Sequence, residues 1–261
     1  MSLSQDPALS ALKQNFICGY RDITGMPYAG VSGVHDNFGN AVNTTNGAGP
    51  HNIQIFMLAT DGTVLNCLPG YWNSQDLIPE MQLAAQLNQV WVNPRLSRAQ
   101  KDAYFRRLQI AHVQEHPPGM TRRSHLQGFD AMYEAEQRPY TSDFIRNPQI
   151  AAAAVNSGMR VPPNAFKTTD VVMHERMSKH PFMQYDRFDV ASFADYGKQK
   201  YDKEEDYRTA DGKVDMERAR SAPELGDRSR MHMGRRRQQE QNDPKVWGNN
   251  QWGNNQWTGD H

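Results

Sequence analysis

The stretch His-Val-Gln-Glu-His places two imidazoles and a carboxylate where they could act on one metal ion. On a helix, His112 and His116 lie four residues apart and share a face, as two zinc ligands should, with Glu115 beside them as a general base. A catalytic zinc site of this type also needs an acidic ligand on a later helix and a much larger fold. Pro117-Pro118 end the helix at once. The sequence therefore favours incidental metal binding over a catalytic zinc site, and an ordinary surface helix over both.

Two other segments mix methionine with histidine, namely MHERMSKHPFM at 173–183 and MHM at 231–233. Thioethers and imidazoles suit copper. Met173 and Met177, however, have the four-residue spacing of a helix face that packs on a core, so the packing interpretation is favoured. His125 is a further candidate for incidental metal binding with the two histidines at 112 and 116.

The two cysteines, Cys18 and Cys67, are candidate thiols, but the chain contains no Cys-x-x-Cys motif. Both lie in apolar segments that read as strands, where a thiol is usually a buried and unreactive group. A redox role would need an electropositive and partly exposed setting. The sequence therefore favours inert thiols.

The first third of the chain predicts a mixed set of elements that would position these residues. Asp61-Gly62 between two apolar runs is a strong hairpin signal, because glycine accepts the positive φ of a tight turn. The predicted elements are a helix at 7–14, strands at 15–23, 52–59 and 63–69, and a helix at 75–90.

Beyond residue 93 the chain predicts helices and polar loops. Ser97 and Gln100 form a capping box that opens a helix ending near His116, with Tyr104, Leu108 and Ala111 on its apolar face. Further helices are predicted at 121–138, 144–157 and 168–179.

Composition narrows the classes of function. The chain has 261 residues, with 29 Lys plus Arg and 29 Asp plus Glu, so nucleic acid is an unlikely partner. No apolar run is long enough to span a membrane, and the start shows no signal peptide, which predicts a cytoplasmic protein if the chain start is complete.

The segment 197–261 is charged and poor in aliphatic residues, which predicts an extended or disordered tail. It ends in a five-residue repeat whose Trp247, Trp252 and Trp257 are candidate anchors for a protein partner.

The order helix, strand, long loop, hairpin, helix over residues 6–90 resembles the second half of a thioredoxin-like domain. NIQIFMLATDGTVLNCLPGYW resembles the final antiparallel strand pair of that fold, and NSQDLIPEMQLAAQL its closing helix. The likeness is closest to bacterial thioredoxin-domain proteins with long C-terminal extensions. It implies an α/β fold with a partial thioredoxin-like sheet at 1–92, a helical extension at 93–196 and a disordered tail at 197–261.

This resemblance also implies a gap. The family carries Cys-x-x-Cys at a helix N-terminus, and this chain begins after that point. The missing strand would lie between the strands at 15–23 and 52–59. Those two strands could pair directly, another segment could fill the gap, a partner chain could supply a strand, or the gene start could be truncated. Cys18 and Cys67 would lie about 9–10 Å apart even without the missing strand, beyond the reach of a disulfide.

The resemblance places one candidate cleft in the loop 35–52. Pro50 occupies the position where the family has a cis-proline beside its active site, and His35, Asp36 and His51 lie close to it in sequence. A ligand or metal ion there is one interpretation, and a long connecting loop is the other.

Three hypotheses for the function follow. The first is a non-catalytic thioredoxin-like interaction or structural protein, with a protein partner or a homo-oligomer and no cofactor. The second is a thiol-redox protein whose Cys-x-x-Cys half is missing from this chain. The third is a metal-binding protein that uses the histidines, which metal analysis would test. The absence of Cys-x-x-Cys makes an enzyme the less favoured reading.

Overall fold

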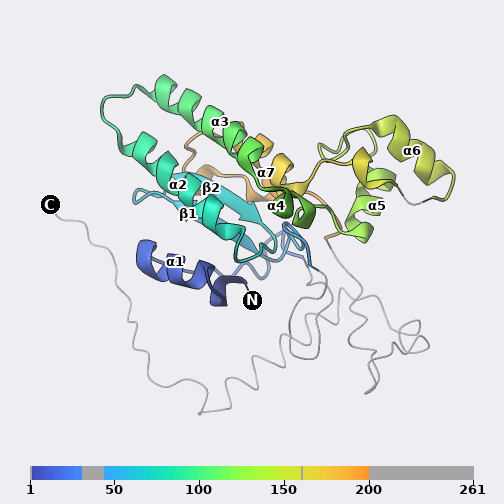
Figure 1. The fold of residues 1–261 in the computed structure, drawn as a ribbon, viewed down its shortest axis with the longest axis horizontal. Coiled ribbons are helices and arrows are strands. Elements are labelled where there is room, and N and C mark those ends of the chain that lie inside the picture. The colour runs from blue at the N-terminus through green and yellow to red at the C-terminus, as the bar shows by residue number, and fades with distance from the viewer. Residues whose placement is uncertain (1, 31–43, 160, 200–261) are drawn as a thin grey trace, which may run out of the picture. The chain divides into compact units, whose positions relative to one another are not determined.

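The computed structural model describes residues 2–30, 44–159 and 161–199 (Figure 1). These residues form a mixed α/β fold with eight α-helices and a two-stranded antiparallel sheet. The predicted α/β class is confirmed at this level. The predicted tail at 197–261, with its three tryptophans, lies outside the described residues except for its first three positions.

The predicted hairpin is confirmed. Strand β1 (Gln54–Leu58) pairs with β2 (Val64–Pro69), and Phe56 lies opposite Cys67. In the turn, Gly62 has φ +82°, and the Asp61 carboxylate accepts a hydrogen bond from the Thr63 amide at 3.0 Å. Every residue of β2 is buried. Helices of the fold therefore pack against β2 and bury it completely.

The predicted strand at 15–23 is wrong. After the 3-10 turn η1 (Ser2–Ser4), helix α1 (Ala8–Asn15) forms close to its predicted place, but residues 16–23 belong to no strand. Ile17 and Tyr20 are almost fully exposed. Apolar and aromatic residues there suit a strand, but strand formation also requires a partner, and the described part of the chain supplies none.

Helices α2 (Leu77–Val92) and α3 (Arg98–Glu115) form a hairpin beside the sheet (Figure 1). The predicted capping box is confirmed: the Gln100 amide donates to the Ser97 hydroxyl, and the Ser97 amide donates to the Gln100 side chain. The predicted apolar face of α3 is wrong at Tyr104, whereas Leu108 is partly buried and packs against the core. Tyr104 is exposed, while Phe105 and Gln109 are buried.

The remaining helices follow α3 in the chain. The predicted helix at 121–138 is two helices separated at 124–127, and the predicted helix at 168–179 is confirmed as α7. The elements are α4 (Pro118–Arg123), α5 (Gly128–Gln137), α6 (Pro148–Asn156), η2 (Pro163–Ala165), α7 (Thr169–Ser178), η3 (Tyr185–Arg187) and α8 (Val190–Phe193).

One hydrophobic core contains residues from both sides of residue 92. Leu68 and Trp72 from the hairpin region, Phe105 from α3 and Met173 from α7 are buried together with many others. Helix α3 packs against both α2 and α7, and α2 and α7 also pack against β2. These three helices therefore meet over the same strand.

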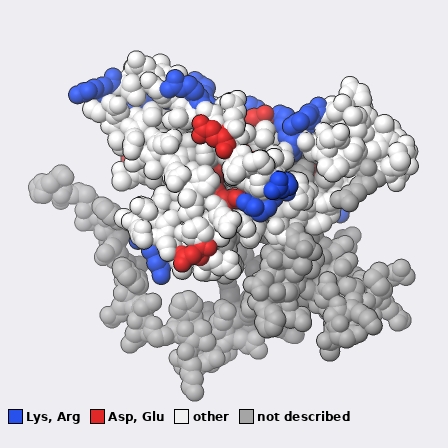
Figure 2. All heavy atoms as spheres, viewed as in Figure 1, with Lys and Arg blue, Asp and Glu red and all other residues white. Residues whose placement is uncertain are grey.

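Charged groups are scattered over the face shown in Figure 2. Small patches of Lys and Arg and of Asp and Glu lie among larger uncharged areas, and near the centre a patch of each sign touches the other. Among the described residues, no helix is both long and apolar enough to cross a membrane.

Candidate metal centre

Four side chains that could ligate a metal ion meet where the three helices converge. Glu80 comes from α2, His112 from α3, His116 from the C-cap of α3, and His174 from α7. One ligand atom from each lies within 4.8 Å of every other. Both histidines of the His-x-x-Glu-His pattern belong to this group. The glutamate of the pattern, Glu115, is exposed and does not belong to it.

Local sequence explains how α3 presents two histidines. Residues 105, 109, 112 and 116 recur at helical spacing and form one stripe that faces the core. The helix ends at His116, whose φ of −60° and ψ of 129° are extended, because the prolines that follow disfavour a helical continuation. The proline pair that counts against a catalytic helix thus places the second histidine at the helix end.

The imidazoles converge on one oxygen. Glu80 Oε1 lies 3.1 Å from His174 Nε2, 3.3 Å from His112 Nε2 and 3.4 Å from His116 Nε2. A single carboxylate oxygen is thus faced by three ring nitrogens of the same type. Such a convergence is the arrangement by which proteins bind transition-metal ions.

A second layer of polar side chains holds these groups in place. His116 Nδ1 lies 2.9 Å from Asp170 Oδ2, and His174 Nδ1 lies 2.5 Å from Gln109 Oε1. The Asn66 amide donates to Glu80 Oε2 at 2.8 Å. A metal-ligating histidine commonly donates its other ring N–H to a carboxylate or carbonyl in this way.

The second layer decides where the ring protons lie. Asp170 accepts from His116 Nδ1. Gln109 presents its oxygen to His174 because its amide nitrogen donates to the Leu65 carbonyl at 3.4 Å. A neutral ring of His116 or His174 would therefore carry its proton on Nδ1 and direct its Nε2 lone pair toward the Glu80 oxygen. Lone pairs that face an oxygen repel it unless a proton or a cation lies between them.

The four side chains are largely buried, so any of their polar atoms that lacks a partner costs free energy of folding. The side chains of Glu80 and His174 are 0% exposed, that of His116 is 2% exposed and that of His112 is 13% exposed. His116 Nε2 is buried without a hydrogen-bond partner, because its 3.4 Å approach to Glu80 lacks hydrogen-bond geometry. A buried polar atom without a partner costs free energy, and a bound cation would remove that cost.

The pKa values describe the same group without an ion. Burial raises the pKa of Glu80, but the charge of His174 and the close approach of all three imidazoles outweigh it and hold the pKa well below its ordinary value. Burial lowers the pKa of His116, but Asp170 and Glu80 raise it to about 9. Metal binding would therefore have to displace the proton that His116 holds at neutral pH.

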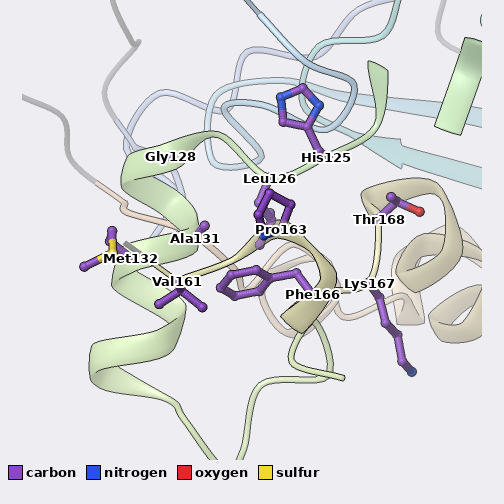
Figure 3. A pocket seen from close by; sticks show the side chains of 10 residues that line it. All are labelled: His125, Leu126, Gly128, Ala131, Met132, Val161, Pro163, Phe166, Lys167 and Thr168. Carbon is purple, nitrogen blue, oxygen red and sulfur yellow. The ribbon is translucent and has the colours of Figure 1, made fainter. Parts of the chain in front are cut away.

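The other predicted metal residue lies elsewhere. His125 is exposed, and its Nδ1 lies 2.7 Å from the Arg122 carbonyl oxygen. It lines an apolar cavity together with Ala131, Val161 and Phe166, whose side chains lie close together in Figure 3. None of the four clustered residues lines this cavity.

The predicted cleft around Pro50 is not seen among the described residues. His35 and Asp36 lie outside the described residues, and Pro50 and His51 are buried. No cis bond precedes Pro50, whereas one precedes Pro7. His51 Nδ1 lies 3.1 Å from the Tyr28 carbonyl oxygen, and His51 Nε2 lies 3.1 Å from the Tyr196 carbonyl oxygen. Backbone carbonyl oxygens are therefore the partners of both ring nitrogens of His51.

The two thiols have opposite environments. Cys18 is exposed on the unpaired segment, and Cys67 is fully buried in β2. Burial raises the pKa of the Cys67 thiol well above its ordinary value. Cys67 is therefore a thiol rather than a thiolate at neutral pH.

Sequence analysis missed Glu80 and did not single out His174. Each residue had a weak signal, because each interrupts an apolar helix face that packs on the core. Glu80 lies among Leu77, Met81 and Ala84, and His174 lies between the buried Met173 and Met177. A charged or titratable residue on a buried face is rare unless it is paired.

No family model, no curated protein and no solved structure matches this chain.

Proposed function

We propose that this is a metal-binding protein whose buried site of three histidines and one glutamate holds a transition-metal ion. The observation that carries the proposal is the orientation of the rings: Nδ1 of His116 and of His174 meets an acceptor, and all three Nε2 atoms face Glu80 Oε1. A cation at that point would accept the ring lone pairs and neutralise the carboxylate.

The ion would join three helices that are distant in sequence. Glu80 is on α2, His112 and His116 are at the end of α3, and His174 is on α7. Because the unfolded chain does not preform such a site, the free energy of metal binding contributes to folding. The expected role is a structural cross-link within the core.

Metal analysis of the full-length protein, purified without a histidine tag, tests the proposal. We expect about one tightly bound ion per chain, retained through dialysis, because four buried ligands should release it slowly. His116→Ala should abolish binding, and the matched His125→Ala should leave it unchanged because His125 lies outside the cluster. A metal-free protein that takes up no zinc, iron, copper, nickel or cobalt on reloading would refute the proposal.

A thioredoxin-like relationship for residues 6–92 remains a further proposal. The order of β1, β2 and α2 is compatible with it, whereas the extended and unpaired segment after α1 does not support it. An interaction role through a protein partner or a second copy stays a prediction, as does a thiol-redox role completed by another segment. Light scattering of the purified protein, and an insulin-reduction assay, would test these two ideas.

A further inference from the structure

We propose that the ion is zinc and that the four side chains alone hold it, in a closed tetrahedral site without a position for substrate. This inference rests on the proposed function, because it specifies the ion and the coordination of the same site. The centre would then be a structural zinc site and not a catalytic one.

The three distances from the Glu80 oxygen to the imidazole nitrogens match edges of a tetrahedral site. Zinc binds imidazole nitrogen and carboxylate oxygen at about 2.0–2.1 Å, so the edges of a tetrahedral site are roughly 3.3–3.4 Å. The three edges from Glu80 Oε1 to the histidine Nε2 atoms are 3.1, 3.3 and 3.4 Å. An octahedral ion with bonds of similar length would bring neighbouring ligands to about 2.9 Å, closer than any of these three edges.

The number of available donor atoms also fits four-coordination. Glu80 Oε2 accepts the Asn66 amide, whereas Oε1 faces the three imidazoles, which favours Oε1 as the ligand and a monodentate carboxylate. His116 and His174 each use Nδ1 in the second layer, which leaves only Nε2. The group therefore offers one oxygen and three nitrogens, a donor set typical of zinc and unlike the oxygen-rich sets that magnesium and calcium prefer.

Burial leaves little access for a fifth ligand. Three of the four side chains are at most 2% exposed, and only His112 reaches 13%. The apolar cavity near His125 is lined by none of the four. A catalytic zinc site keeps one position open to water or substrate, and a structural site has four protein ligands.

Cobalt substitution distinguishes a closed site from an open one. The full-length protein is stripped with a chelator and reloaded with Co²⁺, which gives intense visible absorption when tetrahedral and weak absorption when six-coordinate. We expect intense absorption that zinc displaces at one equivalent and that azide leaves unchanged. His112→Ala removes the most exposed ligand, and we expect the spectrum of this variant to respond to azide.

Each result is informative. Failure of zinc, cobalt, iron, copper and nickel alike to bind would refute the proposed function itself, whereas binding of one of the last three without zinc or cobalt would overturn only the choice of zinc. Cobalt bound with weak absorption, or a wild-type spectrum that azide alters, would leave metal binding intact and overturn the closed site. Iron or manganese in the purified protein, with no displacement by zinc, would overturn the choice of zinc.

Discussion

Two regions of this molecule bury histidine, and they use it differently. At the convergence of α2, α3 and α7, three rings direct Nε2 toward one another and toward Glu80. In the loop before β1, both ring nitrogens of His51 face backbone carbonyl oxygens of Tyr28 and Tyr196. The difference is that the cluster directs its ring nitrogens to one shared carboxylate oxygen, where a cation could bind, whereas the two nitrogens of His51 meet separate backbone carbonyls.

The largest expected effect separates these two regions. Glu80→Gln should abolish metal binding and lower the free energy of unfolding by about 3–5 kcal/mol, because the buried imidazoles lose their counter-charge. His51→Gln should keep the ion and cost about 1–3 kcal/mol, because it disturbs only hydrogen bonds. Metal analysis and urea titration measure both quantities.

Glu115→Gln is the matched control for the glutamate substitution, because Glu115 belongs to the sequence pattern but is exposed. It should change neither metal content nor stability. Loss of the ion in this variant, or its retention in Glu80→Gln, would show that the cluster has been assigned to the wrong carboxylate.

The next effect concerns the layer that orients the rings. Asp170→Asn should lower zinc affinity by about 10–100-fold, because the second-layer carboxylate holds the His116 proton on Nδ1. Asp102→Asn, at a surface pair with Arg98 on α3, serves as the control and should have no effect on affinity. Competition with a chromophoric chelator gives both constants, and equal affinities in the two variants would contradict the orienting role.

Thiol reactivity offers a smaller and independent test. A thiol reagent should modify Cys18 quickly and Cys67 only on unfolding, because Cys67 is buried. The Cys67 amide donates to Asn66 Oδ1 at 3.0 Å, and the Asn66 side chain donates to Glu80, so removal of the ion should speed Cys67 labelling. Mass spectrometry of labelled peptides measures both rates. Equal Cys67 rates with and without the ion would mean that the site does not support β2.

The smallest effect is a pH dependence outside the cluster. Burial raises the pKa of Asp143, but hydrogen bonds and the positive charge of Arg176 outweigh it and leave the pKa below its ordinary value. A lowered pKa in the folded state stabilises the protein above the unfolded pKa of about 3.9, and that contribution is lost as pH falls through the folded value.

Asp143→Asn should therefore reduce stability near neutral pH, by no more than about 1 kcal/mol because the side chain is partly exposed to solvent. The difference from wild type should vanish in acid below the folded pKa. Thermal unfolding at several pH values gives the test, and a difference that grows as pH falls would contradict it.

Local sequence was sufficient for the elements that depend on neighbouring residues. The Asp61-Gly62 turn, the Ser97–Gln100 capping box and the helix that contains Met173 and Met177 were all predicted and confirmed. Each depends on backbone geometry or helical spacing within a few residues. The strand at 15–23 was predicted from the same kind of pattern and is wrong, because strand formation depends on a partner far along the chain.

The face of α3 shows why the candidate site was only half visible. An apolar pattern predicted that Tyr104, Leu108 and Ala111 face inward, whereas the buried stripe includes Gln109 and approaches the core through His112 and His116. A search for hydrophobic spacing does not detect an inward face that carries polar residues. Their burial is explained only by the polar groups of other helices with which they pair.

By itself the sequence determined the hairpin, most of the helices and the pair of histidines at the end of α3, because spacing along one element decides which side chains share a face. Only the tertiary structure brought Glu80 and His174 to that pair, since 94 residues separate them and no local pattern connects them. The same packing separated Glu115 from the cluster and placed His51 between two carbonyls. A metal centre is a relation among atoms of different elements, and that relation exists only once α2, α3 and α7 have packed together.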